Sequence, residues 1–545
     1  MPDLPTTIAD AAAALRAREL SALELTEALL ARARAAQPAL GAFIAFMDGP
    51  AGAAARQADA DFARGADRGP LQGIPLGIKD IIATSDAPTT ANSRVLDRAW
   101  GERPDATSVR KLREAGAVPL GKLTLHEFAT GWPDPATGFQ PARNPWNLGH
   151  SPGGSSSGTG AAVAADLIPA GLGTDTSGSI RGPAAYSGIS GLKPTFGRVS
   201  KEGCVPLGYS LDNIGPMAHT ARDCALLLQT LAGYDPADPC TVDRPVPDYA
   251  AALTGSLEGV RIGLPRAYFL DAPGLEAEVR DAVLAAAEAM GKAGARIVAA
   301  SIPHAEIGSL ACTITIRSES YAYHERDLRE RADLYGRHTR RVLQLGALFT
   351  AADFVQAQRV RALVRAEVAA ALSTADVLLV PTMANLAASF RGYDPDRRLT
   401  ATGYTGLWNM TGNPALSVPG GFSASGLPIG LQIVGRPFDE ATVLAVGDAY
   451  QRLTDWHARR PPALPARPPS DEDVRGYAEE TSEPDAGALA AVGAILAQGR
   501  MQVSEEDRLR LGRVYPALRE LADRIREVEL GPREPALIFP AAVRR

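Results

Sequence analysis

Hydrophobic positions along the chain follow two spacings, which predict two kinds of element. Short apolar runs typical of strands occur at 76–82, 260–264, 296–302, 377–380, 416–419 and 429–434. Longer Ala-rich segments with apolar residues at helical intervals occur near 106–115, 275–292, 352–372 and 440–455. Alternation of strand and helix patterns favours an α/β protein.

The first strong helical pattern covers residues 8–36. Leu15, Leu20, Leu25 and Leu29 recur at roughly helical intervals. The segment Ser21-Ala-Leu-Glu24 has the spacing of a capping box, in which each end residue satisfies a backbone N–H. We therefore expect helix over most of this range.

The C-terminal part of the chain differs in composition from the rest. A proline-rich segment, read as a semi-rigid linker at 461–470, precedes an acidic extension at 471–545. The extension carries 15 acidic residues and 11 arginines, a net charge of −4, against −6 for the whole chain. Most of the net charge therefore lies outside the main body.

Within this extension, one apolar stripe predicts a helix. Ser504-Glu-Glu-Asp507 predicts its start, and Pro516 is expected to kink it. Such a helix packs on its own core or docks on a partner chain, and the pattern leaves both open. The stripe has steps of three and four residues and consists of Leu511, Val514, Leu518, Leu521, Ile525 and Val528.

Composition excludes several classes of protein. The 545 residues are 46% hydrophobic and 22% charged, which is typical of an ordinary globular protein. We expect a cytoplasmic protein without a secretory leader or membrane span, with its four separated cysteines reduced. No spacing of His or Cys predicts a metal site, no cofactor is expected, and no basic cluster indicates nucleic-acid binding.

Lysine is scarce, since only six of 56 basic residues are lysines. Lys79 is the one lysine in the first 110 residues and lies in the apolar strand pattern at 76–82. Burial lowers the pKa of a lysine, and a neutral lysine can act as a base. The alternative is a buried ion pair, for which Asp80 is the nearest candidate.

Two segments rich in glycine and hydroxyl residues are the candidate site. They read SPGGSSSGTG at 151–160 and GTDTSGSIRG at 173–182, on either side of an apolar run. Alone, the first is typical of a flexible linker; together they suggest an anion cradle or a nucleophile with an oxyanion hole. The pattern GxxxxGK[ST] of phosphate-binding loops is absent. A Ser/His/Asp triad using His126 or His150 stays open.

Longer stretches resemble the amidase signature family over about residues 65–460. They include GIPLGIKDII (73–82), SPGGSSSGTGAAVAA (151–165), GLGTDTSGSIRGPAAYSGISGLKPTFGRVS (171–200), LDNIGPMAHTARDC (211–224), NMTGNPALSVPGG (409–421) and GLPIGLQIVG (426–435). The resemblance implies a catalytic domain at 1–460, a large mixed β-sheet surrounded by helices, with the C-terminal helical extension added to it. It also implies a Ser-cisSer-Lys triad of Ser179 as nucleophile, Ser155 and the base Lys79.

The resemblance extends to the residues around the nucleophile. It implies an oxyanion hole of backbone N–H groups at Thr176, Ser177 and Gly178, flanked by Asp175 and Arg181. The chain departs from the family pattern at Ser177 and at Ser157, where the family commonly has glycine. A side chain at residue 177 is expected to narrow the pocket or restrict the loop.

The resemblance implies hydrolysis of a carboxylic amide by an acyl-enzyme on Ser179. The family's glutamine-hydrolysing A subunit of glutamyl-tRNA amidotransferase uses an Asp before the NxxGxP stretch, whereas 399–408 has no carboxylate. We therefore expect a small, aryl or urea- or carbamate-like C–N substrate, and the alternative is the glutamine-hydrolysing A subunit. Tyr404, Trp408 and Met410 are the expected pocket residues.

The expected partners follow from this substrate class. We expect a small-molecule amide substrate, no direct contact with nucleic acid or membrane, and a homodimer. The extension, with Glu534-Pro-Ala-Leu-Ile-Phe539, weakly resembles the small C-subunit partners of such amidases, here fused to the catalytic chain. A catalytically dead binding protein is disfavoured because all three triad positions are filled.

Overall fold

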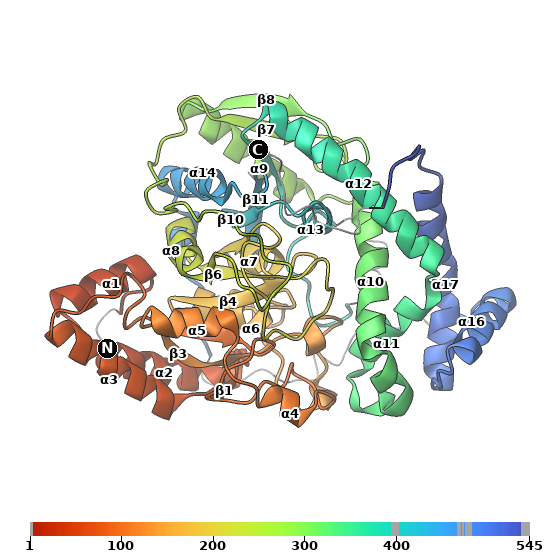
Figure 1. Ribbon diagram of the computed structural model, residues 1–545. Coiled ribbons are helices and arrows are strands. Elements are labelled where there is room, and N and C mark those ends of the chain that lie inside the picture. Colours follow the sequence, from red (N-terminus) through yellow and green to blue (C-terminus); the bar gives the residue numbers. More distant parts are fainter. Residues whose placement is uncertain (1–3, 394–402, 466–469, 471–473, 475–481, 536–545) are drawn as a thin grey trace.

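One large mixed β-sheet forms the centre of the protein, and helices surround it. The computed structural model describes residues 4–393, 403–465, 470, 474 and 482–535. In this part of the chain eleven strands form a single sheet in the order β1-β3-β2-β4-β6-β5-β10-β11-β9-β7-β8, with parallel and antiparallel neighbours (Figure 1). The predicted α/β class and the large mixed sheet are confirmed.

The strands are short, and those in the middle of the sheet are buried on both faces. Their bounds are β1 Phe43–Phe46, β2 Pro75–Lys79, β3 Val118–Leu123, β4 Ala170–Asp175, β5 Ser190–Lys193, β6 Asn213–Ala218, β7 Arg261–Pro265, β8 Arg296–Ala300, β9 Val377–Pro381, β10 Ala415–Phe422 and β11 Pro428–Val434.

The α-helices of the described residues range from one turn to seven. Their bounds are α1 Ile8–Ala17, α2 Ala22–Leu40, α3 Asp48–Ala63, α4 Arg98–Gly101, α5 Thr107–Glu114, α6 Ser157–Ala164, α7 Arg181–Ser187, α8 Ala221–Leu231, α9 Ala277–Lys292, α10 Ala305–Glu330, α11 Arg337–Gln344, α12 Ala351–Thr374, α13 Gly406–Thr411, α14 Glu440–Leu453, α16 Ala486–Gln498 and α17 Glu505–Arg526. Short 3₁₀ turns include η1 Glu127–Ala129, η2 Pro135–Thr137, η3 Ala332–Leu334, η4 Leu345–Leu348 and η6 Trp456–Ala458. None of the described helices combines the length and the apolar composition that a membrane span requires.

The predicted helix at 8–36 is wrong as one element, because it is two helices. Arg18 has a left-handed backbone conformation that ends α1, and the chain restarts at Ser21. Ser21 and Glu24 form both bonds of the predicted capping box. The capping box at Ser21 therefore marks the start of the second helix, α2, and not a position inside one long helix.

Five of the eleven strands, β1, β3, β4, β5 and β6, are absent from the predicted set, and of these β4 carries part of the candidate site. A Cβ on Gly171 would lie 2.9 Å from the Gly77 carbonyl oxygen, and one on Gly173 would lie 2.7 Å from Met217 Sδ. Glycine is required here because neighbouring strands and side chains approach closely. The same glycines remove the hydrophobic alternation by which a strand is recognised.

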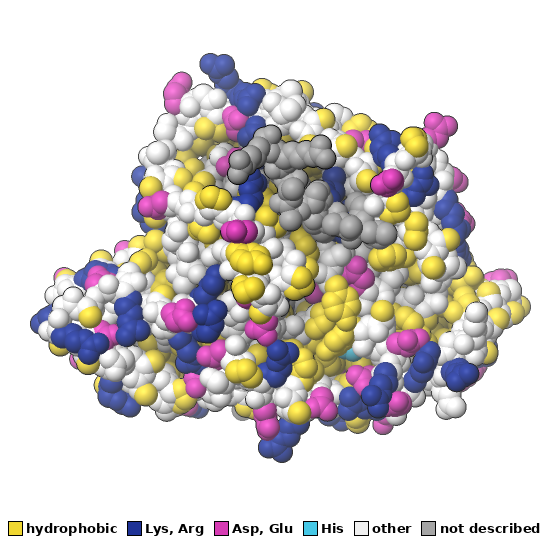
Figure 2. All heavy atoms as spheres, in the orientation of Figure 1, with side chains coloured by type: hydrophobic (Ala, Val, Ile, Leu, Met, Phe, Trp, Pro, Cys, Tyr) yellow, Lys and Arg dark blue, Asp and Glu magenta, His cyan; other side chains and the backbone are white. Residues whose placement is uncertain are grey.

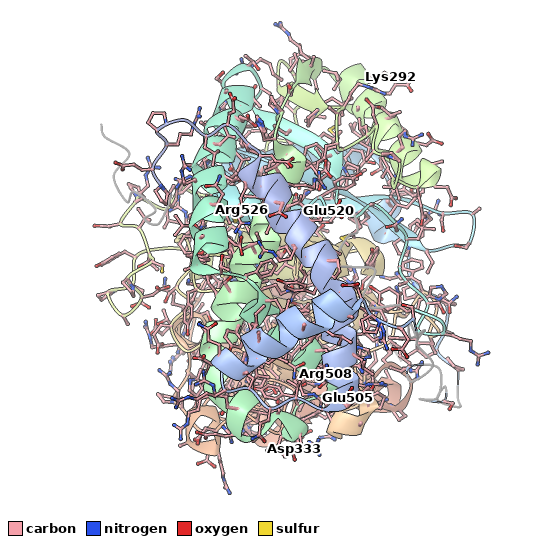
Figure 3. All side chains as sticks on the ribbon, turned by 90° about the vertical axis from the view of Figure 1, so that its right-hand side faces the viewer. Lys292, Asp333, Glu505, Arg508, Glu520 and Arg526 are labelled. Atoms are coloured by element: carbon pink, nitrogen blue, oxygen red, sulfur yellow. The ribbon has the colours of Figure 1, made fainter. Side chains whose placement is uncertain are left out.

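The helices of the C-terminal extension lie over α10 and α12, at the end of the molecule opposite α1–α3 (Figures 1 and 3). Helix α17 continues through Pro516. Leu511, Val514 and Leu518 of α17 pack with Leu345 and Leu348 of η4 in a small hydrophobic cluster. Leu521, Ala522 and Ile525 join the main core. The predicted apolar stripe thus packs against the same chain.

Charged contacts fix both ends of α17. Near its start, Asp507 accepts hydrogen bonds from Arg340 (2.7 Å) and Arg341 (3.0 Å) of α11. Near its end, Arg519 and Arg526 both pair with the buried Asp353 of α12. Buried carboxylates met by two arginines fix the orientation of the helix on the body.

Replacing Leu511 with alanine tests how tightly α17 is packed. Leu511 is fully buried, so Leu511→Ala should lower the free energy of unfolding of the packed region by about 2–5 kcal/mol. Thermal unfolding of the intact chain measures the change. Leu453→Ala is the control, because Leu453 is half exposed and should cost far less. Equal melting temperatures for both variants would contradict the observed packing.

Candidate active site

The end of β2 brings Lys79 to two hydroxyl groups. Lys79 is fully buried, and its Nζ lies 2.8 Å from Ser155 Oγ and 2.7 Å from Thr174 Oγ1. β2 pairs in parallel with both β3 and β4, so Lys79 lies at the end of an interior strand of the sheet. Thr174 lies on β4, the neighbouring strand, whereas Ser155 lies in the glycine-rich segment before α6.

Burial changes the acid–base behaviour of Lys79. Removal from water lowers the pKa of Lys79 to about 7, although the negative charges of Asp175 and Asp212 oppose the shift. A lysine at its ordinary pKa near 10.4 is almost entirely charged at neutral pH. The lowered pKa makes the neutral amine available near pH 7.

Asp80 does not pair with Lys79. Its carboxylate lies 3.3 Å from Lys122 Nζ and accepts hydrogen bonds from Thr90. The alternative of a Lys79–Asp80 ion pair is therefore wrong. Lys79 contacts two hydroxyl groups, and Asp80 contacts a different buried lysine, Lys122.

The two glycine-rich segments lie side by side. The Gly154–Ser155 peptide bond is cis, and the backbone N–H of Ser156 donates to the Ser179 carbonyl at 3.3 Å. Ser155 is therefore held between Lys79 and the segment that carries Ser179.

His126 lies against the same turn and contacts its backbone. A Cβ on Gly154 would fall 2.1 Å from the His126 ring, so glycine is required there. His126 Nδ1 lies 3.2 Å from the Gly131 carbonyl, and its backbone N–H donates to the Ser155 carbonyl at 3.1 Å. His150 pairs by its backbone with Asn144. Because Lys79 contacts a serine hydroxyl directly, the lysine is favoured over either histidine as the base.

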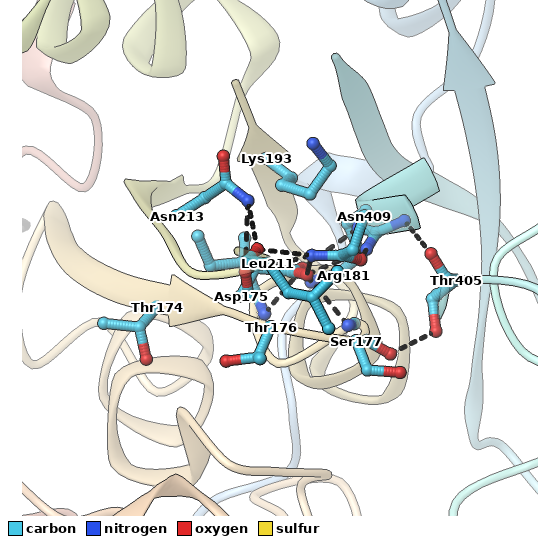
Figure 4. Close-up of polar contacts among 12 residues, drawn as sticks. Thr174, Asp175, Thr176, Ser177, Arg181, Lys193, Leu211, Asn213, Thr405 and Asn409 are labelled. Atoms are coloured by element: carbon cyan, nitrogen blue, oxygen red, sulfur yellow. Dashed lines mark hydrogen bonds and ion pairs between the residues drawn. The ribbon is translucent and has the colours of Figure 1, made fainter. Parts of the chain in front are cut away.

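A buried ion pair holds the loop after β4 (Figure 4). Arg181 Nη2 lies 2.8 Å from Asp175 Oδ1, and both side chains are fully buried. Arg181 also donates to the Thr405 carbonyl, Gln432 and Asn409. Burial alone would raise the pKa of Asp175, but Arg181 outweighs it and holds that pKa well below the usual range. The pair joins β4, α7, α13 and β11.

The predicted oxyanion loop is fixed at each residue. Thr176 Oγ1 donates to Asp212 at 2.5 Å, the Ser177 carbonyl accepts from Thr405 Oγ1 at 2.7 Å, and the Gly178 N–H donates to Asp175 Oδ1 at 2.8 Å. Because the Gly178 N–H already has this partner, it is a poorer candidate oxyanion donor than its neighbours.

Space around the loop explains the unusual side chain of Ser177. Its Oγ lies 3.8 Å from Cys312 Sγ on α10, and a Cβ on Gly406 would lie only 3.0 Å from that Oγ. Glycine at residue 406 therefore leaves room for serine at residue 177. Ser157, the other departure from the family pattern, is the buried first residue of α6.

The three residues expected to line the substrate pocket are all buried. Tyr404 and Trp408 pack around Phe269, with the Trp408 ring stacked on it at 5.7 Å. The Met410 carbonyl accepts a hydrogen bond from Arg361 at 2.7 Å. Their contact with substrate stays a prediction.

Several site residues were missed from the sequence. Thr174 contacts Lys79, Thr405 holds the loop, and Asn409 donates to Asp175 at 3.0 Å. Asn409 stands at the start of the NMTGNPALSVPGG stretch, which could have marked it. Thr174 lies within the GTDTSGSIRG segment, which could have marked it, whereas the contact of Thr405 with the loop could be found only from the fold.

A cavity of about 290 Å³ adjoins this arrangement. Thr174, Thr176 and Asp212 lie in its wall, along with Cys204 and Tyr209. Among the residues that the structure describes, no group of three His, Cys, Asp or Glu side chains could hold a metal ion. The face in Figure 2 carries interspersed positive and negative side chains, with hydrophobic groups in its middle.

The chain is similar over most of its length to known amidases and amidotransferase A subunits. The family model described as Amidase matches residues 24–444. The A subunit of glutamyl-tRNA(Gln) amidotransferase from Chloroflexus aggregans is 45% identical over 484 residues, covering 84% of this chain and 98% of the relative.

Solved structures also resemble the chain over most of its length. One is described as a vestigial protein complex that reveals the origins of an s-triazine catabolic enzyme, with a TM-score of 0.77, 32% identity, and 82% and 98% coverage of this chain and that chain. Native peptide amidase from Stenotrophomonas maltophilia has a TM-score of 0.74 at 32% identity, with 85% and 99% coverage. The chain belongs to the amidase family, the amidase signature enzymes, which are hydrolases of carbon–nitrogen bonds.

One expectation must be corrected. The expected partners were a small-molecule amide, no nucleic acid and a second copy of the chain. Relatives at 45% identity are named as the A subunit of a glutamyl-tRNA(Gln) amidotransferase, so the expectation is wrong. The expectation rested on a local feature, the absence of a carboxylate at 399–408, whereas the similarity extends over 98% of the length of the relative.

The pKa of Lys79 predicts a pH dependence. Labelling of Ser179 by a serine-directed fluorophosphonate should increase with pH through about pH 7 and then level off, because only the neutral lysine accepts a proton. Lys79→Arg should slow labelling by roughly 10²–10⁴-fold, since a guanidinium stays charged.

Lys111→Met is the matched control for this measurement. Lys111 is partly buried, and it donates to the backbone carbonyls of Leu231 and Ala232, away from Lys79 and its hydroxyl partners. Its removal should leave the labelling rate and pH profile unchanged. Labelling by Lys79→Arg at the parent rate would exclude Lys79 as the base.

Proposed function

We propose that this chain hydrolyses a carboxamide through an acyl-enzyme on Ser179, with Ser155 and Lys79 transferring the proton. The observation that carries the proposal is the buried Lys79 Nζ, 2.8 Å from Ser155 Oγ, with its pKa lowered to about 7. A buried amine facing a serine is suited to activating a hydroxyl nucleophile at neutral pH.

The reaction would proceed in two stages. Ser179 Oγ attacks the carbonyl carbon while its proton passes through Ser155 to Lys79. Backbone N–H groups of the loop at 176–179 stabilise the oxyanion, each such donor contributing about 3 kcal/mol. The proton then returns to the leaving nitrogen, the C–N bond breaks, and ammonia leaves. Water hydrolyses the ester by the same proton path, releasing the carboxylate and Ser179.

We propose glutamine for the amide, in a role like that of the amidotransferase A subunit. The similarity to proteins of that name, over 98% of their length, supports this choice above the small, aryl or urea-like amides. In such a role the ammonia would be used by a partner protein acting on a tRNA-linked substrate. The described residues 403–408 contain no carboxylate that could bind the amino group of glutamine. In this proposal another group of the protein binds that amino group.

An amide panel tests the substrate. Glutamine, asparagine, an aryl amide, an aliphatic amide and a urea-type amide are compared by ammonia or amine release. Glutamine should have the highest kcat/KM, and Lys79→Ala and Ser179→Ala should abolish release from every active substrate. A clear preference for the aryl or urea-type amide would reject the glutamine assignment while leaving the acyl-enzyme mechanism in place.

We also propose that residues 471–545 act as a built-in equivalent of a small C-subunit partner. Supporting this, α17 covers α10 and α12, and α10 carries Cys312 against Ser177 of the oxyanion loop. The extension would thus stabilise the helices behind the site.

Supplying the extension as a separate chain tests this role. Residues 1–470 alone should be poorly soluble and weakly labelled at Ser179, because the apolar faces of η4 and α12 lose their cover. Co-expression of 471–545 should restore both properties. If residues 1–470 alone match the full chain in solubility and labelling, the extension is not a stabilising partner.

A further inference from the structure

Two hydroxyl groups, from Ser155 and Thr174, lie within hydrogen-bond distance of Lys79 Nζ in the described chain. The Oγ atoms lie at 2.8 and 2.7 Å respectively, so the amine is held between them. Thr174 is buried at only 4% exposure, and its backbone is fixed on both sides. Its N–H and carbonyl both bond Ser156 Oγ, at 3.3 and 3.2 Å.

A neutral lysine amine has two N–H donors and one lone pair. For Lys79 to take a proton from Ser155, the lone pair must point toward Ser155 Oγ. That orientation leaves an N–H for another acceptor, and Thr174 Oγ1 is placed to receive it. Without this acceptor, a long and flexible side chain would rotate among several orientations, of which only some are productive.

We infer that Thr174 is a positioning residue, which accepts a hydrogen bond from Lys79 and thereby aims the amine lone pair at Ser155. This inference rests on the proposed function. Thr174 acts through Lys79 and does not reach the substrate's reacting atoms in this role. Its position on β4, directly before Asp175, couples the base to the strand that begins the oxyanion loop.

The hydrogen bond also has a predictable effect on acidity. A hydroxyl that accepts from an ammonium stabilises the charged form, so its loss should lower the pKa of Lys79 further. The acid limb of the pH profile should therefore move to lower pH in Thr174→Val. A variant that is only destabilised would lose amplitude without moving the limb.

Three variants separate these effects. Thr174→Val keeps the shape and removes the hydroxyl, and Thr174→Ser restores the hydroxyl. Thr159→Val is the matched control: Thr159 is fully buried against the same strand, but its Oγ1 donates to the Leu172 carbonyl at 3.2 Å. Melting temperatures of all three variants show any general loss of stability.

The measurement is the rate of fluorophosphonate labelling of Ser179 across pH, together with kcat and KM on the best amide of the panel. Thr174→Val should label ~10- to 100-fold more slowly at its plateau, the range expected for losing a hydrogen bond to a group that carries charge, with kcat reduced rather than KM raised. Thr174→Ser and Thr159→Val should stay within ~3-fold of the parent, well below that range.

Each outcome has a definite meaning. Parent-like labelling and pH profile in Thr174→Val would overturn the positioning role alone. Equal losses in Thr174→Val and Thr174→Ser, or in Thr159→Val, would show a packing effect and would also overturn it. A parent chain that is not labelled at Ser179 would overturn the proposed acyl-enzyme and this inference with it.

Discussion

The buried pair of Asp175 and Arg181 is the interaction on which the geometry of the site depends. Two fully buried charges are stable only when nearly all of their hydrogen-bonding groups are satisfied. Asp175 meets this condition with backbone N–H groups and Asn409, and Arg181 meets it with the Thr405 carbonyl, Gln432 and Asn409. Satisfying the pair thus brings β4, α7, α13 and β11 together, and hydrogen bonds hold the loop at 176–178 between them.

Lys79 is buried in a different way from the Asp175–Arg181 pair. Its nearest hydrogen-bonding partners are neutral hydroxyls, so the cost of desolvation lowers the pKa of the amine instead of being offset by a carboxylate. The buried ion pair and the buried lysine have complementary effects on the site. The Asp175–Arg181 pair holds the segment around Ser179 in place, and in the proposed mechanism Lys79 transfers protons within that fixed arrangement.

Motifs and periodicity predicted the class of fold and several strands and helices, and the structure brings Lys79 Nζ and Ser155 Oγ to 2.8 Å from each other. Lys79 and Ser155 could be paired only through the family resemblance, since 76 residues separate them. Strand β4 was missed because glycines needed for close packing erase its hydrophobic pattern. Thr405 and Gln432 were missed because nothing local shows that they face Arg181, which is more than 200 residues away from both in the sequence.

The scarcity of lysine is a weaker indication of chemistry than it first suggests, because Lys122 and Lys193 are also fully buried. Burial lowers the pKa of all three lysines. Their partners differ: Lys122 contacts the Asp80 carboxylate, the Ile82 carbonyl and the Thr89 hydroxyl, and Lys193 donates to the Pro194 carbonyl. Carboxylates and carbonyls can only accept, so they cannot give a proton to an amine. A hydroxyl can do both. Among the described partners of the three lysines, Lys79 is the one that contacts a serine hydroxyl, and its two hydrogen-bonding partners are both hydroxyls, which is the arrangement that the proposed proton transfer requires.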